Sequence, residues 1–489
     1  MNSSEVRLRS TRMAAKSSPA SRPRRCGRMA VMRVVLLSTY ELGHQPFGLA
    51  SPAAWLRTAG ADVVSQDLSR DRLDEDAVRS AAVVAFYLPM HTATRLALPV
   101  IDRVRSLNPS ARIVAYGLYA LTNAGLLRAR GVEGLFGGEF EAALVAFALH
   151  PSEVSPEDPR VDIETGLRVL GGPVARLTFI TPDRAGLPPL SRYARLQHGA
   201  RRLVSGYTEA SRGCKHLCRH CPVVPVYGGQ FRIVPVDVVL GDIRNQVAAG
   251  AEHVTFGDPD FFNGPAHAVR VVEALHAEFP GLTYDVTIKV EHLLRHARHL
   301  PLLKRTGCLF VTSAVESVDD TVLARLDKGH TSADVERAVI VCRSHGLALA
   351  PTFVPFTPWT TVGGYCDLLT AVARLDLVDQ VAPVQLSIRL LIPAGSRLLE
   401  LPDLQALAGR FDPAALAHRW RHQDPRVDEL HREVAAVVGR QLTAPRRRVF
   451  EQLWQLAYAV ADAGTRTMPV PEILADRTSV PYLNEPWYC

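Results

Sequence analysis

The segment Gly213-Cys214-Lys215-His216-Leu217-Cys218-Arg219-His220-Cys221-Pro222 decides how the rest of this 489-residue sequence is interpreted. Three of its eight cysteines lie here in Cys-x3-Cys-x2-Cys spacing, and the others are scattered along the chain. A disulfide framework would spread cysteine pairs over a small secreted chain, so a metal site in the cytoplasm is the better interpretation. Thiolates suit iron–sulfur clusters and zinc. A tight loop can bring three sulfurs to three irons of one cubane cluster, which leaves the fourth iron without a protein ligand.

A strand–helix alternation begins at Leu203, just before this loop, and continues to about residue 401. About six such units in roughly 200 residues predict a partial α/β barrel, whose chemistry lies at the carboxyl ends of its strands. The predicted strands are Leu203–Glu209, His253–Phe256, Tyr284–Lys289, Cys308–Val315, Ala348–Phe356 and Pro383–Leu391. The predicted helices between them include Val236–Ala249, Ala266–Glu278, Val290–His299, Asp319–Leu326 and Ser332–His345.

A second alternation precedes the loop, from Arg33 to His150. It predicts a parallel, Rossmann-like sheet with helices on both faces, which binds ligands at the carboxyl ends of its strands. The predicted strands are Val34–Ser38, Ala61–Ser65, Ala82–Tyr87, Ile113–Tyr116 and Gly134–Phe136. The predicted helices are Ser51–Ala59, Thr92–Leu107 and Glu139–His150.

These patterns divide the chain into an α/β domain over 32–150, a linker over 151–202, a barrel over 203–401 and a helical C-terminal region over 402–489. The linker is rich in Pro, Asp and Arg. The predicted C-terminal helices are Asp412–His422, Asp428–Leu442 and Arg447–Ala463, and an irregular tail follows them. The fold class is therefore α/β.

Residues 1–31 form a basic leader with eight Arg or Lys and one acid, Glu5. We expect this leader to be disordered, or the start to be set too early, with Met29 or Met32 as the true first residue. A twin-arginine signal at Arg24-Arg25 is disfavoured, because Arg33 interrupts the short apolar run after it.

The leader accounts for the whole net charge of +7, because the rest of the chain carries 48 basic and 48 acidic residues. Binding to nucleic acid is therefore not expected from the high pI. An uninterrupted apolar run of about 18 residues, as a membrane span requires, is absent from the sequence. We therefore expect a cytoplasmic protein without a membrane partner.

The cysteine loop, the strand before it and the barrel pattern after it resemble the radical S-adenosylmethionine (SAM) superfamily over residues 203–401. The resemblance implies that Cys214, Cys218 and Cys221 hold a [4Fe–4S] cluster, and that SAM binds the open iron. An electron from a reductase, flavodoxin or ferredoxin would then cleave SAM to methionine and a 5′-deoxyadenosyl radical. That radical would abstract hydrogen from a small-molecule or other substrate that the sequence does not identify.

The resemblance also implies which residues contact SAM. His220, before the third cysteine, would contact the adenine, with a surface histidine as the alternative. Gly257 and Asp258 match the turn near the amino group, although Phe256-Gly257-Asp258-Pro259-Asp260 departs from the commoner Gly-Gly-Glu. Four further candidates lie at later strand ends, where ion pairs without a role in binding are the alternative: Lys289, Glu316, Ser317 and Arg389.

The first α/β domain is similar to the cobalamin-binding domains of many radical SAM proteins, on its early helix over 52–60 and its Gly137-Gly-Glu-Phe-Glu141 segment. The lower-ligand motif Asp-x-His-x-x-Gly is absent, and His44 does not match it. Bound cobalamin would favour methyl transfer, and a scaffold domain is the alternative. Methylthiotransferases carry cluster cysteines in their first domain, whereas this chain has none between Val31 and Gly213.

The tail Glu485-Pro486-Trp487-Tyr488-Cys489 resembles the end of the radical SAM family named for its CUAEP or CCAEP tail. The hypothesis is that the chain stops at a UGA codon that is recoded as selenocysteine, with Cys489 as a candidate redox residue. An ordinary terminal cysteine is the alternative.

Two rival functions remain open. A binding module without catalysis would hold zinc in the cysteine loop, with His216 or His220 as the fourth ligand. Peptide-modifying radical SAM enzymes often carry extra cysteine-rich domains after the barrel, and here only Cys489 lies beyond Cys366.

Overall fold

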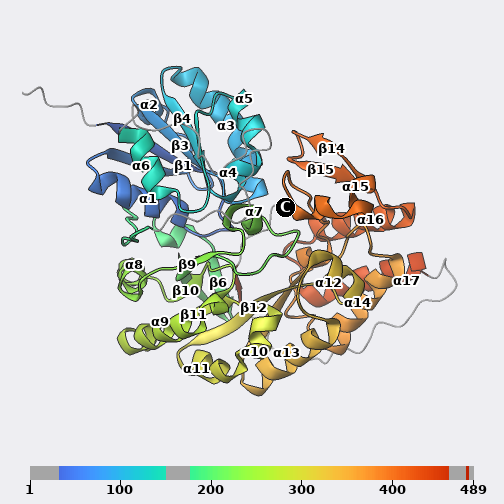
Figure 1. Ribbon diagram of the computed structural model, residues 1–489. Helices are drawn as coiled ribbons and strands as arrows, with labels where there is room; N and C mark the ends of the chain where they lie inside the picture. Colours follow the sequence, from blue (N-terminus) through green and yellow to red (C-terminus); the bar gives the residue numbers. More distant parts are fainter. Residues whose placement is uncertain (1–31, 150–176, 462–480, 484–489) are drawn as a thin grey trace, which may run out of the picture. The chain divides into compact units, whose positions relative to one another are not determined.

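The computed structural model describes residues 32–149, 177–461 and 481–483 (Figure 1). The leader, the first part of the linker and Cys489 lie outside the described residues. None of the helices in the described ranges is long and apolar enough to cross a membrane.

The first sheet has five parallel strands in the order β2-β1-β3-β4-β5. Its strands are β1 (Arg33–Ser38), β2 (Asp62–Asp67), β3 (Val83–Tyr87), β4 (Arg112–Tyr116) and β5 (Gly134–Phe136). Its helices are α1 (Phe47–Thr58), α2 (Glu75–Arg79), α3 (His91–Leu107), α4 (Leu118–Thr122), α5 (Ala124–Ala129) and α6 (Glu141–Leu149).

Helices bury both faces of this sheet, and alternate side chains of each strand point to opposite faces. In β1, Val34 and Leu36 pack with the helices α1 and α6, whereas Val35 and Leu37 pack with α2–α5. Figure 1 shows these two helical layers on either side of the sheet. The Rossmann-like expectation is confirmed.

The second sheet has seven strands in the order β13-β12-β11-β10-β7-β6-β16. The parallel strands are β7 (Arg201–Thr208), β10 (His253–Phe256), β11 (Thr283–Thr287), β12 (Cys308–Glu316) and β13 (Ala348–Phe353). Two antiparallel strands, β6 (Arg195–His198) and β16 (Tyr482–Leu483), extend one edge.

Helices follow these strands along the chain and cover the outside of the sheet (Figure 1). They are α8 (Val236–Ala248), α9 (Pro265–Glu278), α10 (Val290–Arg295), α11 (Leu300–Arg305), α12 (Asp320–Leu326), α13 (Ser332–Ser344) and α14 (Val362–Arg374). A single apolar core joins all of them except α12 to the strands, and Val322 and Leu326 of α12 belong to a smaller cluster. The α/β class with a partial barrel is therefore confirmed.

The sixth barrel strand predicted at Pro383–Leu391 is wrong. The 3-10 helix η4 (Pro383–Leu386) occupies its first half, and the second half makes only one parallel bridge, between Arg389 and Phe356. Pro383 lacks the N–H that a ladder needs and suits the first turn of a helix, so the strand cannot begin there.

The helix predicted at Asp412–His422 is also wrong, because this segment belongs to a hairpin of β14 (Ala408–Asp412) and β15 (Ala417–Trp420). The Asp412 carboxylate accepts the N–H of Ala414, and Leu416 has a left-handed φ of 52°. The buried Trp420 donates its indole N–H to Leu390 O. Local turn hydrogen bonds and tertiary packing outweigh the helical pattern here.

The remaining C-terminal helices are α15 (Pro402–Leu407), α16 (Pro425–Arg440) and α17 (Arg446–Ala461). Helices α16 and α17 carry a buried apolar stripe each and complete the barrel core with side chains such as Val434 and Trp454. Helices α16 and α17 thereby cover the barrel, whereas Leu404 of α15 and Trp420 of β15 pack with α12 in a smaller cluster.

Arg212 joins the first α/β region to the barrel. It lies in the short strand β8 (Ser211–Gly213), and only 7% of its side chain is exposed. Its guanidinium pairs with Glu141 at 2.6 Å, with Glu139 at 3.5 Å and with Glu209 at 2.7 Å. Two of these carboxylates belong to the Gly-Gly-Glu-Phe-Glu segment of the first region. Arg212 therefore links that segment to the strand that leads into the cysteine loop.

We predict that Arg212→Met lowers the free energy of unfolding by about 3–5 kcal/mol, because it leaves buried carboxylates without their cation. Urea denaturation at pH 7 measures the change. The matched control is Arg201→Met. The Arg201 side chain, which pairs with Glu252, is 72% exposed, so its loss should lower the free energy of unfolding by at most about 0.5 kcal/mol. Equal losses in the two variants would contradict the role given to Arg212.

Candidate functional site

The cysteine loop begins where β8 ends, at Gly213. This glycine has a φ of +75°, and a Cβ atom there would lie 2.4 Å from Gln230 O, so only glycine fits. The next residue, Cys214, donates its N–H to the same oxygen at 3.1 Å. Helix α7 (Val223–Tyr227) begins directly after Cys221 and Pro222. A closed turn between β8 and α7 thus holds all three cysteines.

The three thiols lie close enough to influence one another. Burial raises the pKa of Cys214 to about 11 and that of Cys221 to about 12, and the neighbouring cysteines contribute to both increases. Cys218 is 7% exposed. Three sulfurs in one buried loop, with neighbouring positive charge from Lys328, suit a [4Fe–4S] cluster, since iron would supply the charge that thiolates need.

Glu316 lies at the end of β12 and connects two residues near the cysteines. Its Oε1 lies 3.2 Å from His220 Nε2 and 3.2 Å from the buried ammonium of Lys328. Burial acts to raise the pKa of Glu316, but Lys328 and His220 lower it to about 2. The carboxylate is therefore charged and orients the imidazole that precedes the third cysteine.

Gly257 and Asp258 follow β10. A Cβ atom at Gly257 would lie 1.9 Å from Tyr207 OH, so the chain passes against that ring. The Asp258 carboxylate accepts the N–H of Ala210 at 2.9 Å and the hydroxyl of Ser211 at 2.5 Å. Burial raises the pKa of Asp258 to about 7. Asp258 thus fixes the start of β8, just before the cysteines.

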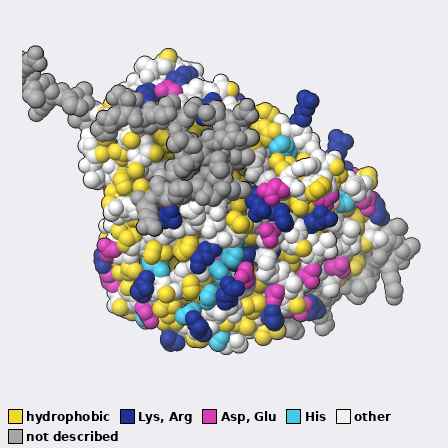
Figure 2. Space-filling model, viewed as in Figure 1, with side chains coloured by type: hydrophobic (Ala, Val, Ile, Leu, Met, Phe, Trp, Pro, Cys, Tyr) yellow, Lys and Arg dark blue, Asp and Glu magenta, His cyan; other side chains and the backbone are white. Residues whose placement is uncertain are grey.

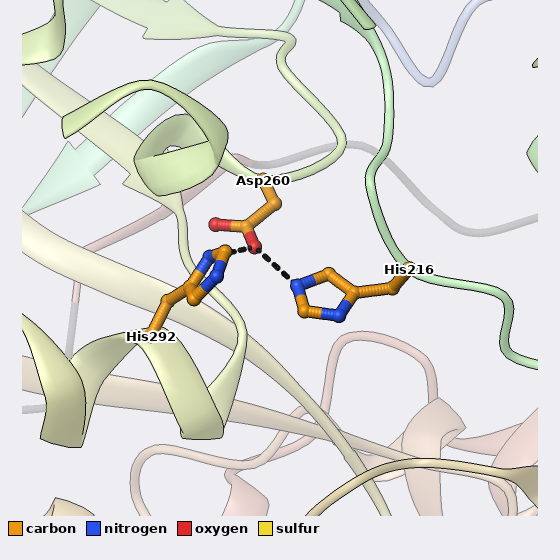
Figure 3. Close-up of side chains that lie close together, drawn as sticks. All are labelled: His216, Asp260 and His292. Carbon is orange, nitrogen blue, oxygen red and sulfur yellow. Dashed lines mark ion pairs between the residues drawn. The ribbon is translucent and has the colours of Figure 1, made fainter. Parts of the chain in front are cut away.

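Lys289 precedes α10 and lies 3.0 Å from Nδ1 of His216 in the cysteine loop. The other nitrogen of His216 faces Asp260, and His292 approaches the same carboxylate (Figure 3). The sequence analysis predicted Lys289 as a site residue. It did not predict the group of two histidines and an aspartate, which is seen only in the structure.

The remaining sequence candidates have other surroundings. Arg389 pairs with Asp428 at 2.8 Å and stacks 3.6 Å above the Trp420 ring, both in the C-terminal region. The Ser317 hydroxyl accepts the N–H of Asp319 in the turn before α12. Cys489 lies outside the described residues.

The carboxyl edge of the first sheet faces the segment after the cysteine loop. Helix α7 contacts α4, and Val226 and Tyr227 lie against Gly137 and Gly138 at the end of β5. Buried hydroxyls of Ser38 and Ser65, in β1 and β2, have no hydrogen-bond partner among the described residues. An edge with orphaned polar atoms and close glycines suits a polar organic cofactor.

Sequence reasoning missed several residues of the site: Glu209, Arg212, Asp260, His292 and Lys328. Asp260 and His292 follow the ends of β10 and β11, where barrel enzymes place their functional groups, so strand position was an available signal. Lys328 follows Asp327, which caps the C-terminal end of α12 in a left-handed conformation with a φ of 56°. Its proximity to the cysteines depends on the long-range packing of α12, which no local pattern reveals.

Comparison with known families gives a match to the radical SAM superfamily over residues 208–357. This range includes all three cysteines of the loop and ends after β13. The match covers the core of the second sheet and none of the first.

Curated relatives match over parts of their length. The hopanoid C-3 methylase of Methylococcus capsulatus is 24% identical over 151 residues, which are 31% of this chain and 29% of that protein. The bacteriochlorophyllide d C-12(1)-methyltransferase of Chlorobaculum tepidum is 26% identical over 149 residues, 30% of this chain and 32% of that protein. The ribosomal protein uS12 methylthiotransferase RimO of Geobacter sulfurreducens is 22% identical over 243 residues, 45% and 52% of the two chains. The chain thus spans about half or less of each relative.

Solved structures share the fold over a larger part of the chain. The cobalamin-dependent SAM radical enzyme OxsB with aqua-cobalamin bound superposes with a TM-score of 0.67 at 14% identity, over 88% of this chain and 73% of OxsB. The radical SAM methyltransferase TsrM from Kitasatospora setae, with cobalamin and a [4Fe–4S] cluster bound, gives 0.54 at 19% identity, over 71% and 74%. At these identities the likeness shows the fold alone.

We predict that Lys328→Met lowers the free energy of unfolding by about 3–5 kcal/mol at pH 7, because it leaves Glu316 buried without its cation. The double variant Glu316→Gln/Lys328→Met should lose less than this single variant. Urea denaturation of the metal-free chain at pH 7 tests both, with the exposed Lys304→Met as the control.

The same pair gives a pH dependence with a defined sign. The Glu316 pKa is lower in the folded chain than its ordinary value of 4.5, so the pair stabilises the fold above that value and loses its effect as the pH falls from about 4.5 towards 2. Lys328→Met should remove this contribution to acid destabilisation. An unchanged acid profile would contradict the pairing.

Proposed function

We propose that this chain is an enzyme that cleaves SAM reductively at a [4Fe–4S] cluster held by Cys214, Cys218 and Cys221, because residues 208–357 match the radical SAM superfamily. The observation that carries the proposal is the placement of all three thiols in one closed turn after β8, at the carboxyl side of the first parallel barrel strand. When bound, such a cluster supplies the electron that splits SAM into methionine and a 5′-deoxyadenosyl radical.

The chain's own residues would position SAM and limit side reactions. Glu316 holds the His220 ring beside the third cysteine, in place to contact the adenine. The Lys289 side chain is 8% exposed, and its ammonium offers a cation for the SAM carboxylate. Gly257 permits close approach of the backbone after β10, while Asp258 keeps β8 in register. Burial of these groups keeps water from a reactive radical.

We further propose that the first sheet binds cobalamin and that the reaction is methyl transfer. OxsB and TsrM were solved with cobalamin bound, and their folds match 88% and 71% of this chain. Two of the curated relatives carry methylase or methyltransferase names. The glycines and orphaned hydroxyls at the carboxyl edge of the first sheet would cradle the cofactor, which would supply the methyl group. A scaffold role for this sheet is the competing interpretation.

The substrate class that we propose is a small molecule, with a reductase, flavodoxin or ferredoxin as electron donor. The proposed division is a leader over 1–31, an α/β domain over 32–150, a linker over 151–202, a barrel over 203–401 and a C-terminal region over 402–489. Within the linker, β6 already pairs with β7, so its last residues belong physically to the second sheet.

The decisive experiment measures SAM cleavage by protein that has been purified anaerobically and reconstituted with iron and sulfide. We expect about four irons per chain, and 5′-deoxyadenosine by mass spectrometry after reduction and addition of SAM. The triple variant Cys214→Ala/Cys218→Ala/Cys221→Ala should lose both. Cys342→Ala, a cysteine of α13, should keep both.

The same preparation separates the rival functions. About one zinc per chain, with no iron–sulfur absorption, would favour a zinc-binding module and contradict the enzyme proposal. Incubation with hydroxocobalamin followed by gel filtration tests the first sheet. About one retained cobalamin per chain is expected, and a protein that cleaves SAM but retains none would assign the sheet a scaffold role.

We also propose that the chain belongs to the group with the CUAEP or CCAEP tail, on the residues Glu485-Pro486-Trp487-Tyr488-Cys489. The gene sequence beyond codon 489 tests this group: codons for Ala-Glu-Pro after one further codon would support it, and a different continuation would contradict it.

A further inference from the structure

Two histidines and one aspartate converge beside the cysteine loop from three separate segments (Figure 3). His216 belongs to the loop itself, Asp260 follows β10, and His292 lies in the first turn of α10. His292 Nδ1 lies 2.6 Å from Asp260 Oδ2, and His216 Nε2 lies 3.4 Å from the same oxygen. One ligand atom from each residue falls within 4.8 Å of the others.

These three atoms are buried and lack hydrogen bonds of acceptable geometry within the described residues: Asp260 Oδ2, His216 Nε2 and His292 Nδ1. The Asp260 side chain is 1% exposed and that of His292 is 5% exposed. The other carboxylate oxygen, Oδ1, already accepts the N–H of Phe262. Their mutual contacts of 2.6 and 3.4 Å do not have hydrogen-bond geometry, and a cation between them would give all three atoms a partner.

We propose that His216, Asp260 and His292 bind a divalent transition-metal ion of the zinc class, separate from the three cysteines. Two imidazole nitrogens and one carboxylate oxygen are a common ligand set for zinc and for Fe²⁺, with the open positions taken by water or another ligand. The site would fasten the cysteine loop to the turn after β10 and to α10. Its function is positioning, because each ligand comes from a different strand end.

The surroundings of His216 determine how the metal can bind. A metal on Nε2 requires the imidazole proton on Nδ1, which must then donate to an acceptor. Glu291 Oε2 lies 3.7 Å from Nδ1, beyond hydrogen-bond distance, and would have to move closer to accept that N–H. The Lys289 ammonium now lies 3.0 Å from Nδ1 and would pair with Glu291 instead, from which it is already only 3.5 Å away. A carboxylate behind a metal-bound histidine is the usual arrangement.

More histidines extend from this group along the chain. The His292 and His296 ring centroids lie 5.4 Å apart, and those of His296 and His299 lie 6.5 Å apart. Figure 2 shows histidine side chains gathered on this face of the barrel. His296 and His299 are not part of the three-ligand group, which makes His296, the residue directly after α10, a matched control.

Zinc added to the reconstituted protein tests the site while iron and sulfide occupy the cysteines. After dialysis against zinc we expect about one zinc per chain by mass spectrometry, since zinc outcompetes Fe²⁺ at nitrogen and oxygen ligands. X-ray absorption at the zinc edge should show nitrogen and oxygen at about 2.0–2.1 Å with imidazole scattering, and no sulfur at about 2.3 Å.

Asp260→Asn and His292→Gln each remove a metal ligand. Each should weaken zinc affinity by more than the roughly 10–100-fold that follows loss of a residue hydrogen-bonded to a ligand. His296→Gln should bind zinc as the parent chain does. Circular dichroism and iron content report whether each variant is folded. If the two ligand variants do not fold, Glu291→Gln provides the test, with an expected loss of about 10–100-fold in zinc affinity.

Three results would overturn the proposal: no bound zinc in protein with a full cluster, equal zinc binding by the parent chain and Asp260→Asn, or sulfur in the zinc shell. Iron content and 5′-deoxyadenosine formation are measured on the same samples. Failure of the zinc site with intact SAM cleavage therefore differs from failure of the proposed enzyme function, in which iron and cleavage are missing.

Discussion

The contact on which the rest of this structure depends is the buried guanidinium of Arg212 among Glu139, Glu141 and Glu209. A single buried cation cannot neutralise three carboxylates, and burial raises the pKa of Glu139 to about 7 and raises that of Glu209 as well. The Arg212 pKa is itself raised well above its ordinary value, because the carboxylates outweigh the effect of burial. The group is therefore held together by hydrogen bonds and partial protonation as well as by charge.

This contact sets the geometry of the cysteine loop from the side of the first sheet. Arg212 lies two residues before Cys214, and the Gly137–Glu141 segment that supplies two of its partners also contacts α7, directly after Cys221. The loop is thus held at both ends against the carboxyl edge of the first sheet. A cofactor on that edge and a cluster in the loop would be neighbours, which is the arrangement that a methyl carrier and a radical generator require.

The barrel side of the loop is held by charge as well. Lys328 and His220 share the Glu316 carboxylate, Asp258 accepts hydrogen bonds from Ala210 and from Ser211 at the start of β8, and His216 reaches the buried carboxylate of Asp260. These contacts come from the ends of β10 and β12 and from the turn after α12. Since ends of parallel strands meet at one edge, one loop can be fixed by residues up to about a hundred positions away.

The sequence by itself determined the α/β class, the two alternating regions and the three cysteines, because periodic burial and ligand spacing are local properties of the chain. It placed the strands His253–Phe256 and Gly134–Phe136 without error. The strand predicted at Pro383–Leu391 is wrong because Pro383 begins a 3-10 helix. The helix predicted at Asp412–His422 is wrong because the turn hydrogen bond of Asp412 and tertiary packing favour a hairpin.

Only the tertiary structure decided which charged groups meet. Lys328 pairs with Glu316, Arg212 with the glutamates of the first region, and Asp260 with His216 and His292. Sequence reasoning treated Arg389 as a candidate ligand, whereas folding places it against Asp428 and Trp420. The physical reason is that ion pairs and metal ligands form across distant segments, and their positions follow from how helices and strands pack rather than from any local pattern.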